Sequence, residues 1–227
     1  MASTAKTRTQ AEQQRRVREA AARARSLRNR AAAAVVVGLG VLLAIFLIST
    51  GGGSPASAGS YPYAVGSPGP GRVAPPIQLA STQGGQFNLA AQRGKTVLLY
   101  FQEGLTCQPC WDQLKELDNN IAQLKRLGID ELVSITTDPL GALQQKASDE
   151  GLTTPVLSDP NLTVSQEYSA NQYGMMGTSF DGHSFVLVGP DGRILWRADF
   201  GGAPNYTMFV PVPVLLADLR KGLAGRA

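Results

Sequence analysis

The sequence has 227 residues, of which 43% are hydrophobic and 17% charged, a composition typical of a globular protein. The net charge of +4 is unevenly distributed, because residues 1–30 carry nine basic and two acidic side chains whereas the rest of the chain carries 12 basic and 15 acidic ones. The folded part is therefore acidic overall, and we expect no nucleic-acid partner.

Residues 31–50 form a hydrophobic segment rich in Ala, Val, Leu and Ile, directly after the basic region. Twenty residues in a helix span about 30 Å, the thickness of the hydrocarbon core of a bilayer. We therefore predict a single transmembrane helix over residues 31–50. The positive-inside rule places the basic tail, residues 1–30, in the cytoplasm. The predicted location is the cell membrane, with one membrane pass and an extracytoplasmic C-terminal domain.

A cleaved signal peptide is the alternative, because residues 56–58 (ASA) have the small-residue spacing of a cleavage site. The long basic region and the length of the hydrophobic segment favour an uncleaved signal-anchor. Residues 51–72 are rich in Gly, Ser and Pro and are predicted to be a flexible linker. The folded domain is predicted over residues 73–224.

From residue 73 onward the pattern is that of an α/β domain. Residues 96–101 (TVLLYF) are continuously hydrophobic, which is typical of a strand buried on both faces. Residues 111–127 have hydrophobic side chains three and four positions apart, which predicts an amphipathic helix. Further strands are expected over residues 77–79, 86–89, 131–136, 155–157, 184–188 and 193–196, and further helices over residues 140–150, 160–170 and 211–221. This order predicts a central mixed sheet flanked by helices.

The two cysteines of the chain are Cys107 and Cys110, between the predicted buried strand and the helix that follows it. Residues three apart at a helix start lie on one face, within disulfide-bonding distance. The free amides and the positive dipole end of a helix favour the thiolate form of Cys107. Pro109 suits a first helical turn, where no amide partner is lost. These features predict a redox-active disulfide.

Two other interpretations of the cysteine pair explain less. A structural disulfide that closes a loop of two residues removes little entropy from the unfolded chain, so it would stabilise the domain poorly. A zinc site would have only three ligands from one CxxC sequence and the single histidine of the chain.

Residues 73–200 resemble the thioredoxin-like redoxin group, which includes the alkyl hydroperoxide reductase/thiol-specific antioxidant family and the TlpA-type membrane-anchored oxidoreductases. Besides the CxxC sequence, the resemblance rests on residues 100–101 (YF), 158–160 (SDP) and 185–192 (FVLVGPDG). It implies a thioredoxin-like fold and a thiol–disulfide oxidoreductase in which Cys107 attacks and Cys110 resolves. The redox-active disulfide itself would be the only cofactor. The partners would be protein disulfides or dithiols, together with a membrane or extracytoplasmic electron donor.

His183 and Glu103 are further candidate catalytic residues. By alignment with thioredoxins, His183 occupies the position of a proline that faces the cysteines. An imidazole with its ordinary pKa of about 6.5 suits proton transfer at neutral pH. Glu103, four residues before Cys107, is a second candidate base.

A copper(I) chaperone similar to the Sco proteins is an alternative function. Two thiolates and one imidazole, from Cys107, Cys110 and His183, would bind the metal. Met175 and Met176, upstream of the histidine, would offer thioether ligands.

A peroxiredoxin-like antioxidant peroxidase is the other alternative. Peroxiredoxins carry a Pro-x-x-x-Thr-x-x-Cys signature. Aligning Cys110 with its cysteine places Glu103 at the proline and Cys107 at the threonine.

Overall fold

The computed structural model describes residues 61–224. The predicted basic tail (1–30), the predicted transmembrane helix (31–50) and the first part of the predicted linker lie outside the described residues. In the described part of the chain, no helix is both long and hydrophobic enough to span a membrane. The elements are, in order, β1 (Gln78–Ser81), β2 (Gln86–Asn88), η1 (Leu89–Gln92), β3 (Val97–Phe101), α2 (Gln108–Asn119), α3 (Ile121–Arg126), β4 (Glu131–Thr136), α4 (Leu140–Asp149), β5 (Val156–Ser158), α5 (Thr163–Glu167), η2 (Ala170–Gln172), β6 (Ser184–Val188), β7 (Ile194–Asp199) and α6 (Val212–Ala224).

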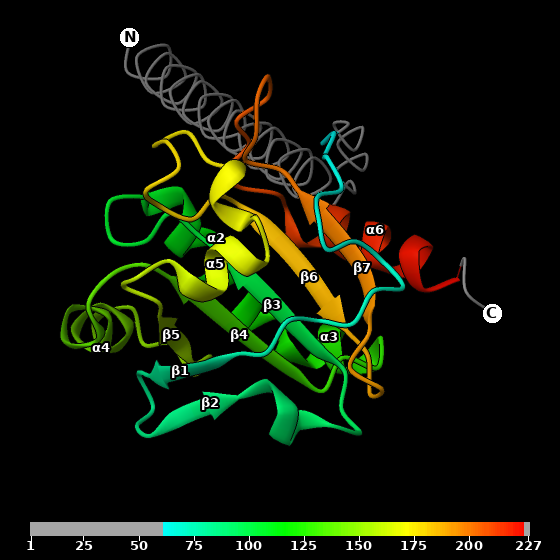
Figure 1. The fold of residues 1–227 in the computed structure, drawn as a ribbon, viewed down its shortest axis with the longest axis horizontal. Helices are drawn as coiled ribbons and strands as arrows, with labels where there is room; N and C mark the ends of the chain where they lie inside the picture. Colours follow the sequence, from blue (N-terminus) through cyan, green and yellow to red (C-terminus); the bar gives the residue numbers. More distant parts are fainter. Residues whose placement is uncertain (1–60, 225–227) are drawn as a thin grey trace, which may run out of the picture. The chain divides into compact units, whose positions relative to one another are not determined.

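Within residues 61–224, the strands form one mixed sheet in the order β2-β1-β5-β4-β3-β6-β7, which can be followed in Figure 1. β3, β4 and β5 are parallel, whereas β6 pairs antiparallel with β3, and β7 with β6. β1 joins the other side of the sheet, antiparallel to both β2 and β5. The predicted mixed sheet is therefore confirmed.

Alternate side chains of β3 point into two separate hydrophobic cores. Leu98 and Tyr100 belong to the core shared with α2, α3, α4 and α6, whereas Leu99 and Phe101 belong to the core shared with α5 and the β1–β2 hairpin. All five residues of β3 are buried, as its continuous hydrophobic sequence predicts. This burial fixes the end of β3 and, with it, the loop that carries the cysteines.

The helix predicted over residues 111–127 differs from the structure at its start and in its middle. α2 begins at Gln108, one turn earlier, because the first turn contains Pro109 and no hydrophobic stripe that a pattern would reveal. It ends at Asn119, and a separate short helix, α3, follows. Asn120 lies at the break, and its side-chain amide donates to the carbonyl of Glu116 at 2.8 Å. Asparagine side chains that bond to nearby backbone in this way compete with helix continuation.

The helix predicted over residues 160–170 is also shorter in the structure. Leu162 and Ser169 both adopt left-handed backbone conformations, with φ of 57° and 49°, and they bound α5 on either side. The side chain of Asp159 accepts a hydrogen bond from the backbone amide of Ser165 at 2.8 Å, within the first turn of α5. The sequence pattern did not reveal the two left-handed residues, since neither is a glycine or an asparagine.

Part of the predicted linker is packed against the domain. Ala64 pairs with Asp199 at one end of β7, and the amide of Gly71 donates to the carbonyl of Ile194 at the other end. Between these points, the carbonyl of Pro68 accepts a hydrogen bond from Arg197 at 3.3 Å. We refer to residues 61–73 as the strap. The strap covers an edge strand that would otherwise present unpaired backbone groups. The predicted boundary at residue 73 is therefore too late.

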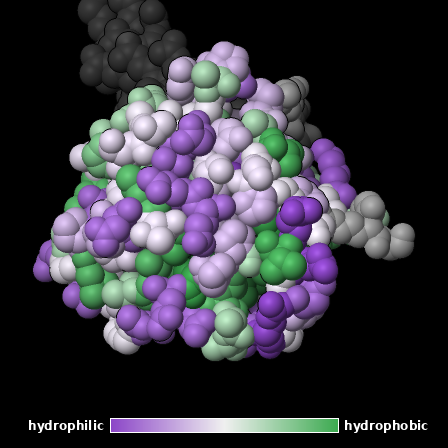
Figure 2. Space-filling model, viewed as in Figure 1, coloured by the Kyte–Doolittle hydropathy of each residue, from purple (hydrophilic) through white to green (hydrophobic). Residues whose placement is uncertain are grey.

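Exposed hydrophobic side chains are scattered over the domain surface. Figure 2 shows hydrophilic and hydrophobic residues interspersed on one face. Three of the exposed hydrophobic residues, Met175, Met176 and Tyr206, belong to two loops that precede β6 and follow β7. Since Phe101 pairs with Ser184, and Ser184 with Asp199, these loops lie at the same end of the sheet as the cysteines.

Candidate active site

Cys107 and Cys110 form a disulfide at the start of α2, with their Cα atoms 5.3 Å apart. Cys107 is the N-cap residue of the helix and Pro109 lies in its first turn. Both cysteines therefore belong to one turn of chain directly after the buried strand β3. The predicted pairing of these two residues is present in the structure.

The two sulfur positions differ in access to solvent. The side chain of Cys107 is 6% exposed, whereas Cys110 is fully buried. Trp111 is also fully buried, and its indole N–H donates to the carbonyl of Gly104 at 3.0 Å, which fixes the loop before the disulfide. An incoming reactant can therefore reach the disulfide only from the side of Cys107.

The start of α2 is an electropositive environment. The free amides of the first turn and the helix dipole both favour an anion at this position. The ammonium group of Lys146, on α4, lies 3.3 Å from the side-chain oxygen of Gln108 and 5.5 Å from the centre of the Trp111 ring. These positive groups favour the thiolate that reduction of the disulfide would produce.

His183 is fully buried and is connected to the cysteine pair through Tyr100. The Tyr100 hydroxyl lies 3.1 Å from Nδ1 of His183 and 3.2 Å from the carbonyl oxygen of Cys110. The Nε2 atom of His183 has no hydrogen-bond partner. Burial lowers the pKa of His183 to about 3, so the ordinary pKa expected from the sequence does not hold and the ring is neutral at physiological pH.

Glu103 is buried and holds the loop that precedes β6. Its Oε1 atom accepts hydrogen bonds from the backbone amides of Met175, at 2.5 Å, and Met176, at 3.1 Å. The sulfur of Met176 in turn accepts a hydrogen bond from the Thr106 hydroxyl at 3.3 Å. Glu103 thus links the cysteine loop to the loop of residues 173–183.

A second buried carboxyl group, that of Asp181, connects the same loop to Ser165 of α5. Asp181 is fully buried, and its Oδ2 atom lies 3.0 Å from the hydroxyl oxygen of Ser165, which also lies 2.7 Å from Asp159. Burial raises the pKa of Asp181 well above its ordinary value. Since the serine has one hydroxyl proton to donate, a neutral Asp181 can donate its own proton to the serine while the serine donates to Asp159.

Sequence reasoning missed three residues of the site: Tyr100, Gln113 and Met208. The sequence showed Tyr100 as a member of a hydrophobic strand and of the family resemblance, but gave it no role in the site. Its alternation with Leu99 places it on the α2 face, but the partner of its hydroxyl comes from a segment more than 80 residues away. Met208 packs with Cys107 and Cys110 from a segment with no regular structure, which carries no periodic signal.

The sequence-predicted copper site does not match the geometry. Within residues 61–224, no group of three His, Cys, Asp or Glu side chains lies in an arrangement that could hold a metal ion. The hydrogen bond of His183 through Nδ1 goes to Tyr100. Tyr100 therefore connects His183 to Cys110 by hydrogen bonds, but Cys107, Cys110 and His183 do not form a set of metal ligands.

Solved structures identify the fold of the described domain. Peroxidoxin BcpB from Mycobacterium tuberculosis matches with a TM-score of 0.55 at 19% sequence identity, covering 67% of this chain and 96% of that protein. The bacterioferritin comigratory protein of Xanthomonas campestris matches with a TM-score of 0.53 at 15% identity, covering 65% of this chain and 92% of the other. The fold is thioredoxin-like. Together with the sequence relationships given next, it makes the protein a redox enzyme of the thioredoxin-like type.

Sequence comparisons give the family. Residues 70–197 match the AhpC/TSA family. Peroxiredoxin Bcp of Escherichia coli (strain K12) is 32% identical over 127 residues, which covers 55% of this chain and 81% of the relative. The chain belongs to the AhpC/TSA family, and the resemblance expected from the sequence is confirmed.

Proposed function

We propose that this chain is a membrane-anchored thiol–disulfide oxidoreductase whose domain acts outside the cytoplasm on protein disulfides or dithiols. The observation that carries the proposal is the Cys107–Cys110 disulfide at the start of α2, with only Cys107 reaching the surface. The hydrophobic segment at residues 31–50, with the basic residues before it, supports the anchor and its orientation.

The reaction proceeds by two thiol–disulfide exchanges. In the reducing direction, the Cys107 thiolate attacks a sulfur of a partner disulfide, forms a mixed disulfide and releases the first partner thiolate. The Cys110 thiolate then attacks the sulfur of Cys107, re-forms the intramolecular disulfide and releases the second partner thiolate. The partner gains two electrons and two protons, and a membrane or extracytoplasmic electron donor restores the dithiol. The oxidising direction is the reverse.

Two buried side chains act as positioning residues in this mechanism. His183, neutral and hydrogen-bonded to Tyr100, holds the turn that carries Cys110. Glu103 fixes the loop of residues 173–183 beside Thr106, next to the attacking sulfur. A group held rigidly beside the reacting sulfurs lowers the entropic cost of reaching the exchange geometry.

A redox titration of the full-length protein in detergent tests the exchange function. The two thiols are alkylated after equilibration in dithiol buffers of known potential. One reversible two-electron transition, in the range of about −270 mV to −120 mV spanned by thiol–disulfide exchange proteins, is expected. A disulfide that resists reduction far below about −300 mV would be structural, and the proposal would fail.

The anchor needs a separate test, because the chemistry does not depend on it. We expect the full-length protein to remain in the membrane pellet after alkaline carbonate extraction, and its domain to be digested when protease is added to spheroplasts. Deletion of residues 31–50 should release the domain without changing its redox transition. Recovery of the full-length protein in the soluble fraction would refute the anchor.

Peroxide reduction is the second candidate function, and the relationship to peroxiredoxin Bcp favours it. One thiolate would attack a peroxide oxygen to give a sulfenic acid and an alcohol or water, and the second thiol would condense with it to give the disulfide and water. Stopped-flow mixing of the reduced protein with hydrogen peroxide or with a disulfide-bonded protein separates the candidates. Faster oxidation by peroxide than by the disulfide protein would assign the peroxidase.

A further inference from the structure

Met208 forms a buried cluster with the two cysteines that is separate from both main hydrophobic cores. Its side chain is 7% exposed, compared with 6% for Cys107 and none for Cys110. A methionine that filled space in the general core would pack with the leucines and aromatic residues of that core. The buried cluster that contains Met208 has the two cysteines as its other members, so three sulfur-containing side chains pack together at the start of α2.

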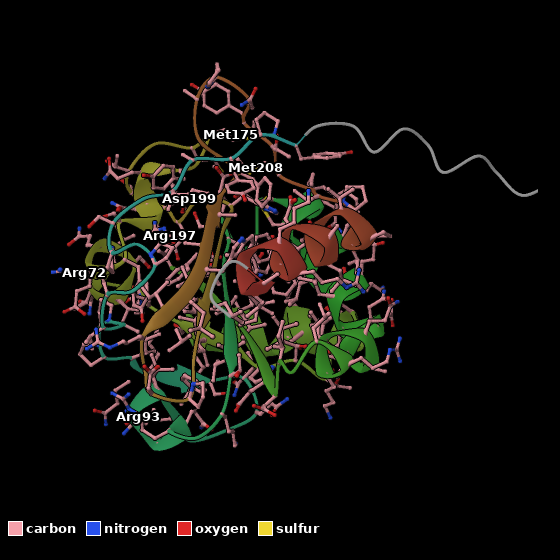
Figure 3. All side chains as sticks on the ribbon, turned by 90° about the vertical axis from the view of Figure 1, so that its right-hand side faces the viewer. Arg72, Arg93, Met175, Arg197, Asp199 and Met208 are labelled. Carbon is pink, nitrogen blue, oxygen red and sulfur yellow. A yellow bond between two sulfur atoms is a disulfide. The ribbon has the colours of Figure 1, made fainter. Side chains whose placement is uncertain are left out.

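Backbone hydrogen bonds on both sides of Met208 fix its position. The amide of Thr207 donates to the carbonyl of Phe200 at 3.1 Å, and the amide of Val210 donates to the side chain of Gln113 at 2.6 Å. Gln113 is itself fully buried on α2, the helix that carries the cysteines. The segment therefore holds the methionine against the cysteine pair without belonging to a helix or strand. In Figure 3 Met208 lies at the same end of the domain as Met175, at the opposite end from Arg93.

Two thiolates and a thioether are soft ligands, which select copper(I) over hard cations. Zinc, by contrast, takes four ligands from thiolate, imidazole and carboxylate groups, and a thioether is a poor substitute. A complex of Cu⁺ with two thiolates carries one negative charge, which the start of α2 and the nearby ammonium group of Lys146 would stabilise. The positive groups around the site thus favour the single negative charge that the copper complex would carry.

We propose that the reduced domain binds one Cu(I) ion through the Sγ atoms of Cys107 and Cys110 and the Sδ atom of Met208. This ligand set replaces the imidazole of the sequence-based prediction, since His183 is hydrogen-bonded to Tyr100. Binding follows reduction of the disulfide, in which a reductant supplies two electrons and two protons are taken up. Cu⁺ then displaces the two thiol protons, and the thioether donates a lone pair with no proton change.

The test uses full-length protein in detergent, reduced anaerobically with a phosphine, which takes up the oxygen of one water molecule and is then removed. Cu(I) is titrated against the chelator bicinchoninate. We expect one bound Cu(I) per chain. Met208→Leu, which conserves volume, should weaken binding at least as much as the about 10- to 100-fold typical of losing a group that supports a metal site. Val73→Leu is the control, because this side chain is 57% exposed and pairs with Arg193, away from the cysteines, so its affinity should equal that of the wild type.

X-ray absorption at the copper edge gives a second readout, and its wild-type measurement does not depend on how any variant folds. The wild-type complex should show three sulfur ligands and Met208→Leu two. Two sulfur ligands in the wild type, equal affinity of Met208→Leu and the wild type, or no binding at all would each overturn the proposal. The redox titration of the same samples distinguishes failure of the copper proposal from failure of the proposed exchange function, because disulfide exchange requires the cysteines but no metal.

Discussion

The Tyr100 hydroxyl lies between the Cys110 carbonyl oxygen and the Nδ1 atom of His183, at 3.2 Å and 3.1 Å. A carbonyl oxygen can only accept, so the single hydroxyl proton of Tyr100 goes to Cys110, and His183 donates its Nδ1 proton to the tyrosine oxygen. Among the polar atoms of this arrangement, the Nε2 lone pair of His183 is then the one without a hydrogen-bond partner. The other tautomer would bury an N–H without an acceptor, which native proteins rarely do. The hydrogen-bond pattern therefore assigns the Nδ1–H tautomer to His183.

Replacing Tyr100 with Phe should destabilise the domain, because Nδ1 of the buried His183 ring would lose its hydrogen-bond partner while Nε2 already has none. The expected loss is about 1–3 kcal/mol in the free energy of unfolding, measured by urea denaturation. Tyr206→Phe serves as the control, since Tyr206 is 45% exposed and should change stability by less than about 0.5 kcal/mol. Equal stability of the two variants would show that the hydrogen bonds of the Tyr100 hydroxyl do not contribute to the free energy of unfolding.

The unequal burial of the two sulfurs predicts which cysteine forms the mixed disulfide. Cys110→Ser keeps Cys107, which is 6% exposed and the less buried of the two, and removes the resolving thiol, so it should accumulate a covalent complex with partner proteins. Cys107→Ser leaves only a fully buried thiol and should form none. Non-reducing gel electrophoresis of membranes from cells that express each variant measures this. Complexes formed by Cys107→Ser at the level of Cys110→Ser would reverse the assigned roles.

The parts of the fold that the sequence predicted well are those with strong local signals. Strand β4 was predicted at its observed bounds and β3 to within one residue. The continuous hydrophobic run of β3 leaves few alternatives to a buried strand. The start of α2, its break at Asn120 and the left-handed Leu162 were missed. Each depends on side chain–backbone hydrogen bonds or local backbone conformations that a hydrophobic pattern does not encode.

The candidate site divides in the same way. The cysteine pair was predictable, because its spacing and its place between strand and helix are local features. The position of His183 was expected from an alignment, but its burial and its link through Tyr100 required the tertiary structure. Glu103 was expected to act as a base, and the structure instead shows its Oε1 atom accepting two backbone hydrogen bonds. Such partners come from segments about 70 residues away, beyond any spacing rule.

Burial of His183 predicts a characteristic dependence of stability on pH. Its pKa is about 3 in the folded protein and about 6.5 when unfolded, so between these values only the unfolded state binds the extra proton. Stability from this group is complete above pH about 6.5 and decreases as pH falls toward 3, by up to about 1.4 kcal/mol per pH unit. Urea denaturation from pH 7 to pH about 4.5 measures the slope.

His183→Asn is the control for this slope, because the amide can still bond to Tyr100 but does not titrate. Asp181 has a raised pKa and contributes the opposite slope, and Glu150, with its pKa lowered to about 2 by Lys146 and Lys115, contributes at the acid end. Both groups are retained in the variant, so the difference between the two proteins isolates His183. Parallel stability curves would mean that His183 has an ordinary pKa in the folded protein.

Glu103 should control the local stability of the loop beside the disulfide. Its carboxylate accepts from the amides of Met175 and Met176, and hydrogen bonds to charged groups are worth about 1.5–3 kcal/mol each. Glu103→Ala should therefore speed hydrogen exchange of these two amides by about tenfold or more. Glu103→Gln keeps an acceptor oxygen and should have a smaller effect. Amides on the buried face of helix α6 provide the internal reference, and loss of their protection as well would indicate global unfolding instead.

The packed strap predicts that Gly66 tolerates no larger residue. Its amide donates to Asp199 at 2.7 Å, and a Cβ atom at this position would lie 2.6 Å from the Tyr173 hydroxyl and 2.7 Å from the Arg197 guanidinium. Gly66→Ala should therefore cost about 1–3 kcal/mol in unfolding free energy, as overpacking does. Gly141→Ala, on α4 with open space around it, is the matched control and should stabilise the domain by up to about 1 kcal/mol. If the strap were a free linker, Gly66→Ala would be as stable as the wild type. Such a result would return the domain boundary to residue 73.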